Sequence, residues 1–175
     1  MARKAAGSSV AAMTTTVDDP VNRVRMAFES RGENLLVDLW LEPGGNLPPH
    51  LHPRQEERWS VVEGSAGFQF GAEKITITPA DGEIVVGPDT VHALSSVSPE
   101  EAHLRCEAVP ALRLRQFLEE SAAAAREGMF TRRGLPRGLR GARWAANFLK
   151  EYREETVFLS PPPLVQRLAI ALFAR

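Results

Sequence analysis

Three histidines and one glutamate have the residue types and the spacing of a metal-ligand set. Residues 44–64 follow the pattern G-x5-H-x-H-x4-E-x6-G, and a further histidine, His92, lies downstream. Because side chains alternate between the two faces of a strand, His50 and His52 project to the same side, and a following strand brings Glu57 alongside them. Imidazole nitrogens with one carboxylate oxygen suit iron(II), manganese(II), nickel, copper or zinc. The pattern is therefore that of a divalent transition-metal site.

The residues that must position these ligands have the pattern of short strands separated by turns, from about residue 21 to residue 110. Aliphatic side chains recur at every second position between residues 35 and 41, which is the period of a strand. Many short strands at close spacing predict an all-β core, closed as an antiparallel sandwich or barrel. We expect strands at residues 35–42, 57–63, 66–70, 74–78, 84–86, 91–97 and 102–109.

After Pro110 the apolar residues recur at helical spacing instead, which predicts an α-helical C-terminal extension over residues 111–175. Pro110 before the first apolar stripe and Gly128 after it are typical start and stop residues of a helix. Ser160 is a candidate cap for the last helix. Residues 131–141 hold four arginines and three glycines and are expected to form a flexible basic connection. The three stripes are Leu114, Phe117, Leu118 and Ala122; Trp144, Ala145, Phe148, Leu149 and Tyr152; and Leu164, Val165, Leu168 and Leu172.

The composition is that of an ordinary globular chain. Its 175 residues are 43% hydrophobic and 25% charged, enough for one well-buried domain with appendages. A formal net charge of -1 creates no field that would attract nucleic acid or anionic lipid. The arginines between residues 126 and 143 lie near acidic residues and have no interleaved aromatic platform of the type that binds single strands, so we expect no nucleic-acid partner. The single cysteine, Cys106, excludes an intramolecular disulfide framework.

The ends of the sequence predict neither secretion nor membrane insertion. Residues 1–20 are small, polar and aperiodic, without the apolar core of a secretory signal, so we expect a disordered leader. The longest apolar stretch, residues 161–174, contains Gln166 and Arg167 and is too short to span a bilayer. We therefore expect a cytoplasmic protein with no membrane partner.

The ligand pattern resembles that of the cupins, which are small antiparallel jelly-roll barrels. Their first motif, G-x5-H-x-H-x3,4-E-x6-G, matches residues 44–64 at every defining position. Their second motif, G-x5-P-x-G-x2-H-x3-N, matches more loosely. His92 is in place, but Asp89 occupies the inner glycine position and Ser96 the asparagine position.

The resemblance covers residues 21–110 and implies a cupin β-barrel domain with one divalent metal inside the barrel. The chain is similar to a bacterial single-domain cupin (a monocupin) that carries a helical C-terminal extension. The ligands that the resemblance implies are His50, His52, Glu57 and His92.

Glu56 is an alternative to Glu57 as the carboxylate ligand, because the family accepts either spacing. The gap of six residues to Gly64, and strand parity with inward apolar residues, favour Glu57. Glu56 is expected to point outward or to pair locally with Arg54 or Arg58.

Apolar residues in strand phase with the ligands are expected to line a substrate pocket. These residues are Trp59, Val61 and Leu94. Trp40 and Phe68 are further candidates, with ordinary core packing as the equal alternative. Asp38 is in phase with Trp40, and a solvated position on the outer face is the commoner one for an aspartate. By strand phase we also expect His103 on the outer face and Cys106 in the core.

Four ligands leave two functional hypotheses open. An octahedral metal would keep two positions for substrate, water or dioxygen, whereas tetrahedral zinc would be closed. Since no second titratable residue lies in strand register as a base, chemistry run by the metal itself is favoured. We therefore predict a metal-dependent enzyme acting on a small organic molecule, with a dioxygenase as the specific hypothesis. The alternatives are a non-catalytic metal-binding or small-molecule-binding protein and a regulatory protein. Exposed apolar helices and sheet edges also favour a homodimer.

Overall fold

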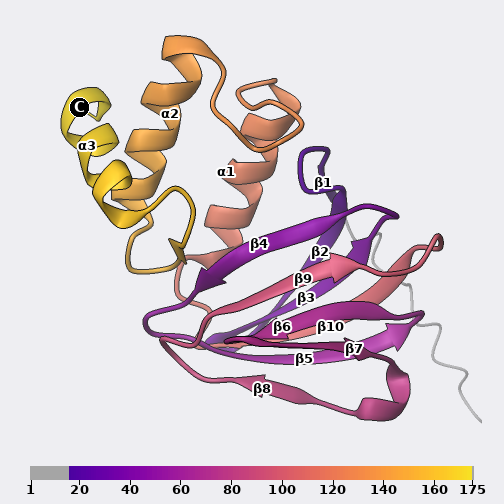
Figure 1. The fold of residues 1–175 in the computed structure, drawn as a ribbon. Helices are drawn as coiled ribbons and strands as arrows, with labels where there is room; N and C mark the ends of the chain where they lie inside the picture. Colours follow the sequence, from indigo (N-terminus) through magenta and orange to yellow (C-terminus); the bar gives the residue numbers. More distant parts are fainter. Residues whose placement is uncertain (1–15, 175) are drawn as a thin grey trace, which may run out of the picture.

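Two antiparallel sheets form the body of the protein, and three helices follow them (Figure 1). The structure is a computed structural model and describes residues 16–174. One sheet has the strand order β1-β2-β3-β10-β5-β8, and the other has the order β11-β4-β9-β6-β7. The strands are β1 (Val17–Asp19), β2 (Val24–Arg31), β3 (Asn34–Leu41), β4 (Asn46–Leu51), β5 (Glu56–Glu63), β6 (Ala66–Phe70), β7 (Glu73–Ile77), β8 (Ile84–Val86), β9 (His92–Ser96), β10 (Ala102–Val109) and β11 (Val157–Phe158).

The predicted all-β core is confirmed, and strands β3 and β5 to β10 lie within a residue of the expected positions. The predicted leader was too long at its C-terminal end. Val17–Asp19 pairs with β2 in the register Val17↔Met26 and belongs to the six-stranded sheet. Two aspartates in three residues gave this edge strand no periodic signal. Residues 1–15 of the expected leader lie outside the described residues.

The core fills the space between the two sheets. Alternate residues of facing strands point inward and are almost fully buried, as strand geometry requires. They include Leu39, Leu41, Phe68, Leu94 and Leu104, each no more than 2% exposed. Removing this apolar surface from water is the main favourable contribution to folding.

Two motif glycines make the turns that flank β4 and β5. Gly44 has φ +76° and Gly64 has φ +81°, a backbone conformation that glycine adopts without steric cost. A Cβ on Gly64 would also lie 3.2 Å from the Cα of Ala102 in β10. These turns deliver the strands that carry the first three candidate ligands.

The helices α1 (Leu114–Arg126), α2 (Gly138–Glu151) and α3 (Pro163–Phe173) lie together on one side of the barrel, near β4 (Figure 1). The ring of Phe117 in α1 lies 5.0 Å from that of Phe148 in α2. The expected basic connection is shorter than residues 131–141, because α2 already begins at Gly138. The buried Gly141 permits close contact there, since a Cβ would lie 2.5 Å from the carbonyl oxygen of Met129.

Helix α3 exposes most of its apolar stripe. Leu164 is 72% exposed and Leu172 is 73% exposed. The N-terminal cap of the helix is Pro162, not the expected Ser160, and no side chain caps it. Among residues 16–174, no helix has the length and apolar character needed to cross a lipid bilayer.

Candidate metal centre

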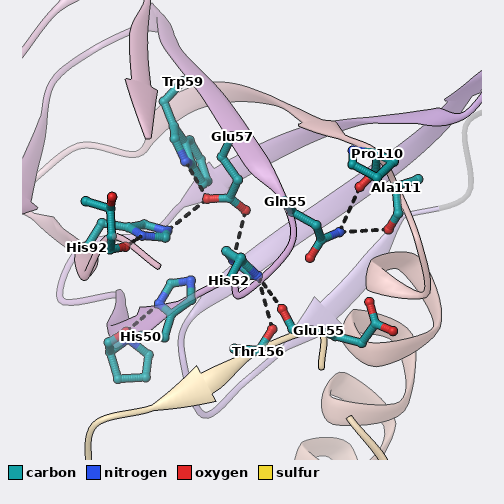
Figure 2. A network of polar contacts seen from close by, with 12 residues as sticks. His50, His52, Gln55, Glu57, Trp59, His92, Pro110, Ala111, Glu155 and Thr156 are labelled. Atoms are coloured by element: carbon teal, nitrogen blue, oxygen red, sulfur yellow. Dashed lines mark hydrogen bonds and ion pairs between the residues drawn. The ribbon is translucent and has the colours of Figure 1, made fainter. Parts of the chain in front are cut away.

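The four candidate ligands come from three strands and converge inside the barrel (Figure 2). His50 lies in β4 with His52 just after it, Glu57 lies in β5 and His92 begins β9. One potential ligand atom from each residue lies within 4.8 Å of the others. All four side chains are buried, from 1% exposed for His92 to 8% for His50. The structure therefore brings together the set expected from the sequence.

Each histidine ring is held by a backbone carbonyl. A carbonyl oxygen can only accept, so each Nδ1 carries the proton, and Nε2 is left with its lone pair. This arrangement fixes the tautomer and the ring orientation of metal-binding histidines. The three donor–acceptor pairs are His50 Nδ1 to Pro48 O (2.7 Å), His52 Nδ1 to Glu155 O (2.7 Å) and His92 Nδ1 to Thr90 O (3.0 Å).

The Nε2 atoms of His52 and His92 both face the Glu57 carboxylate, whose oxygens are also acceptors. His52 Nε2 lies 3.1 Å from Glu57 Oε1, and His92 Nε2 lies 2.8 Å from Glu57 Oε2. With neutral rings neither Nε2 has a hydrogen-bond partner, although both atoms are fully buried. Leaving such groups unpaired is costly, so the cluster requires a shared cation or added protons. Imidazole nitrogens with one carboxylate oxygen fit a divalent transition metal.

The pKa shifts of the cluster favour an ionised Glu57 and a neutral His50, as metal binding requires. Burial raises the pKa of Glu57, but His52 and His92 outweigh it and hold that pKa well below its ordinary value. Burial, with the neighbouring histidines, lowers the pKa of His50 to about 3. Burial also lowers the pKa of His52, yet the Glu57 carboxylate raises it above its ordinary value overall. At neutral pH the centre thus combines one carboxylate anion with a neutral His50.

Trp59 positions the carboxylate ligand. Its indole Nε1–H donates to Glu57 Oε2 over 2.9 Å, and the side chain is only 3% exposed. Glu56 lies on the other face of β5, where it accepts a hydrogen bond from Arg58 Nε over 2.8 Å. This is the local pairing expected for Glu56, and Glu57 is the carboxylate in the cluster.

The turn of the loose second motif contains a residue in the left-handed backbone region. Asp89, at the position of the motif's inner glycine, has φ +58°. Aspartate enters this left-handed region more readily than most residues, so it can replace the glycine. Its backbone N–H donates to His52 O over 2.9 Å, which ties the turn before His92 to the end of β4.

A cavity of about 80 Å³ is lined by three of the candidate ligands, His50, His52 and Glu57, and the expected pocket residues differ in their relation to it. Trp59 lines it, whereas Val61, Leu94 and Phe68 are buried core residues outside its lining. Phe68 nevertheless stacks on His92, with ring centroids 6.4 Å apart.

Trp40 lies on the outer face of the six-stranded sheet and does not line this cavity. It stacks on His103 at 4.7 Å, and the guanidinium of Arg25 lies 4.6 Å from its ring centroid. Its strand phase explains the placement, because Asp38 in the same phase also faces outward, 2.7 Å from His103 Nε2. His103 is thus on the outer face, as expected, and Cys106 is in the core.

The extension supplies parts of the site that the sequence did not predict. Strand β11 pairs with β4, placing Phe158 opposite His50. Just before it, Glu155 O accepts from His52, and Thr156 Oγ1 lies 3.3 Å from His52 Nδ1. In the sequence, β11 shows only one β-branched and one aromatic residue between two helical stripes. Two residues are too few to show a strand period.

The chain was compared with known proteins. No family model matches the sequence. An oxidoreductase of Arthrobotrys oligospora is 36% identical over 55 residues, which are 31% of this chain and only 22% of that relative. An RmlC-like cupin from Shewanella frigidimarina has a TM-score of 0.53 at 20% identity, covering 63% of this chain and 96% of that one. The cupin domain of Schizosaccharomyces pombe Cnp3 has a TM-score of 0.48 at 11% identity, covering 66% and 76%. The chain therefore has the fold of a single-domain cupin, followed by a helical C-terminal extension.

Proposed function

We propose that this protein binds one divalent transition metal through His50, His52, Glu57 and His92 and acts as a dioxygenase on a small organic molecule. One observation carries the proposal. Three imidazole rings, each fixed by a carbonyl at Nδ1, meet a buried carboxylate, and no hydrogen-bond donor satisfies Nε2 of His52 or His92.

The residues of the chain have separate tasks in this proposal. When bound, the metal would supply a Lewis acid and a place where dioxygen and substrate meet. The carbonyls of Pro48, Glu155 and Thr90 keep the imidazole lone pairs directed inward. Trp59 holds the Glu57 carboxylate at one oxygen. Mostly apolar cavity walls surround the reacting centre.

The cavity favours an enzyme whose chemistry depends on the metal. Besides Glu57, the only other carboxylate among the described lining residues is Asp19. Both of its oxygens already accept hydrogen bonds, from the backbone N–H groups of Val21 and Asn22 and from the Asn22 side chain. Asp19 is therefore engaged in a turn and is poorly placed to act as a general base. The oxidoreductase from Arthrobotrys oligospora gives further support to oxidative chemistry.

The metal proposal is tested by elemental analysis of protein purified without an affinity metal. We expect about one transition-metal ion per chain, and His52→Ala and His92→Ala should each lose most of it, because each removes a buried ligand. His103→Ala is the matched control, since that histidine lies outside the centre and pairs with Asp38. Circular dichroism shows whether each variant is folded. Full metal occupancy in folded His52→Ala and His92→Ala proteins would contradict the ligand assignment.

The catalytic proposal needs a second measurement. X-ray absorption of the purified protein should show more than four ligands or a water at the metal, because an octahedral ion keeps two positions beyond the four protein ligands. Oxygen consumption is then measured with a panel of small organic molecules. A closed tetrahedral zinc shell without oxygen consumption would instead favour the non-catalytic binding protein.

A further inference from the structure

The cavity beside the centre indicates what kind of molecule it takes. We propose that its ligand has one polar head, directed at the metal centre beside His50 and His52, and an uncharged apolar body whose length is limited by Leu118 and Phe158. The inference rests on the proposed function, because the head is recognised at the metal centre. It goes further by naming the class of substrate and the side chains that select its size.

The charge of the lining excludes a second ionic group on the ligand. Among the described residues that line the cavity there is no lysine and no arginine. The carboxylate of Glu57 belongs to the metal centre, and that of Asp19 is occupied by its own turn. A carboxylate, phosphate or ammonium group on the body of a ligand would therefore be buried without a partner, which is strongly unfavourable.

The body of the ligand would contact apolar walls. From the barrel side, Met26, Val37 and Leu39 line the cavity, and each is nearly fully buried. From the extension, Leu114 and Phe117 of α1 close it with equally little exposure. The polar lining groups beyond the ligands are Asp19, Asn22, Ser121 and Thr156. Only Asp19 of these four is charged, so the wall recognises shape more than charge.

Leu118 and Phe158 form the adjustable part of the wall. Both line the cavity and both are only half-buried, as are Leu47 and Pro48 of β4, whereas Met26, Val37 and Leu39 are almost fully buried. A volume of about 80 Å³ admits a molecule of a few non-hydrogen atoms. Since Met26, Val37 and Leu39 belong to the packed core, a longer body gains room where a half-buried lining side chain such as Leu118 or Phe158 is shortened.

Three matched thiols test the charge selection on cobalt(II)-loaded protein, in which thiol binding changes the visible spectrum. Propane-1-thiol, 3-mercaptopropionate and 2-aminoethanethiol share a head and a two-carbon spacer and differ in the charge of the far end. We expect propane-1-thiol to bind about tenfold more tightly than either charged thiol, the penalty of an unpaired buried charge. Equal or tighter binding of a charged thiol, or no binding of any thiol by cobalt-loaded protein, overturns the inference.

The same experiment separates the two proposals. Cobalt content is measured before any thiol is added. Protein that takes up no cobalt overturns the proposed function, and this inference with it. Protein that holds cobalt but prefers a charged thiol leaves the metal centre in place and overturns the inference alone.

Size selection is tested with longer thiols on two variants. Leu118→Ala and Phe158→Ala should each improve hexane-1-thiol binding relative to propane-1-thiol about tenfold, because each opens the wall by several methylene groups. Phe158 also pairs with β4, so Leu118→Ala is the variant that leaves the strands untouched, and melting curves show that each protein is folded. Leu172→Ala, on the exposed face of α3, is the matched control and should change nothing. If folded Leu118→Ala protein binds hexane-1-thiol no better relative to propane-1-thiol than the unmodified protein does, Leu118 does not limit the length of the ligand.

Discussion

At the scale of single residues, the centre is defined by what holds the ligands as much as by the ligands themselves. Four buried polar side chains would destabilise a core unless each had a partner. Here each Nδ1 has a carbonyl, Glu57 has the Trp59 indole, and the remaining Nε2 lone pairs converge. The arrangement satisfies every ligand on its outer side and leaves the inner side for a cation.

The two adjacent glutamates give the most direct residue-scale prediction. Glu57→Gln keeps the shape of the side chain but removes the anionic oxygen, so we expect metal affinity to fall by about tenfold or more. Glu56→Gln changes only an exposed pair with Arg58 and should bind metal as the unmodified protein does. Competition with a chromogenic chelator measures both affinities. Equal affinities for the two variants would contradict the assignment of Glu57.

The protonation of His52 predicts how metal binding depends on pH. Burial disfavours its charged form, but Glu57 favours it more strongly, so the pKa of His52 is raised. That proton must leave before Nε2 can bind a metal, and affinity should therefore rise as pH increases through this pKa. Below it, protons compete with the metal. Chelator competition across a pH series, with proton release followed in weak buffer, checks the sign. An affinity that falls with rising pH over this range would contradict it.

At the scale of elements, the sequence predicted strands that have an alternating side-chain pattern and missed contacts made by a strand too short to have one. The expected strands included β5 and β9, and the Glu57 side of β5 followed from parity with Trp59, whereas β4 was anticipated only from the His-x-His spacing. Trp40 was ambiguous because both faces of β3 carry apolar residues, and Leu36 on the outer face is buried as well. Strand β11 has only two residues, and its neighbour Glu155 meets His52 from 103 positions away. Neither local periodicity nor motif spacing contains such a contact.

The link between His52 and the extension predicts that metal binding stiffens β11. His52 Nδ1 donates to Glu155 O, so fixing the ring should stabilise the segment that follows. We expect amide hydrogen exchange of residues 155–159 to slow by about tenfold on metal addition, since local opening would have to release His52. Residues 164–172 of α3, which bear no ligand, should exchange at an unchanged rate. Equal exchange of residues 155–159 with and without metal would show that the two are uncoupled.

At the scale of the whole molecule, one barrel supplies the ligands and the C-terminal extension closes the space beside them. The site is therefore shared between two parts of the chain that the sequence shows as separate patterns. Removing the barrel would expose Phe117 of the extension, and removing the extension would expose Met26 and Leu39 of the barrel. The homodimer and the cytoplasmic location stay predictions. The exposed leucines of α3 are the kind of surface on which the expectation of a dimer was based.

Because the ligands lie on three strands of the barrel, metal binding should stabilise the fold as a whole. A metal that binds only the folded chain adds about 2.7 kcal/mol at a hundredfold excess over its Kd. For a chain of this length, each kcal/mol raises Tm by roughly 2–4 °C, so adding metal to the stripped protein should raise Tm by roughly 5–11 °C. Scanning calorimetry with and without metal measures the shift. His103→Ala should retain it, because that side chain lies on the outer face with Asp38, whereas His92→Ala should lose most of it. A shift of equal size in His92→Ala protein would mean that the metal stabilises the molecule from another site.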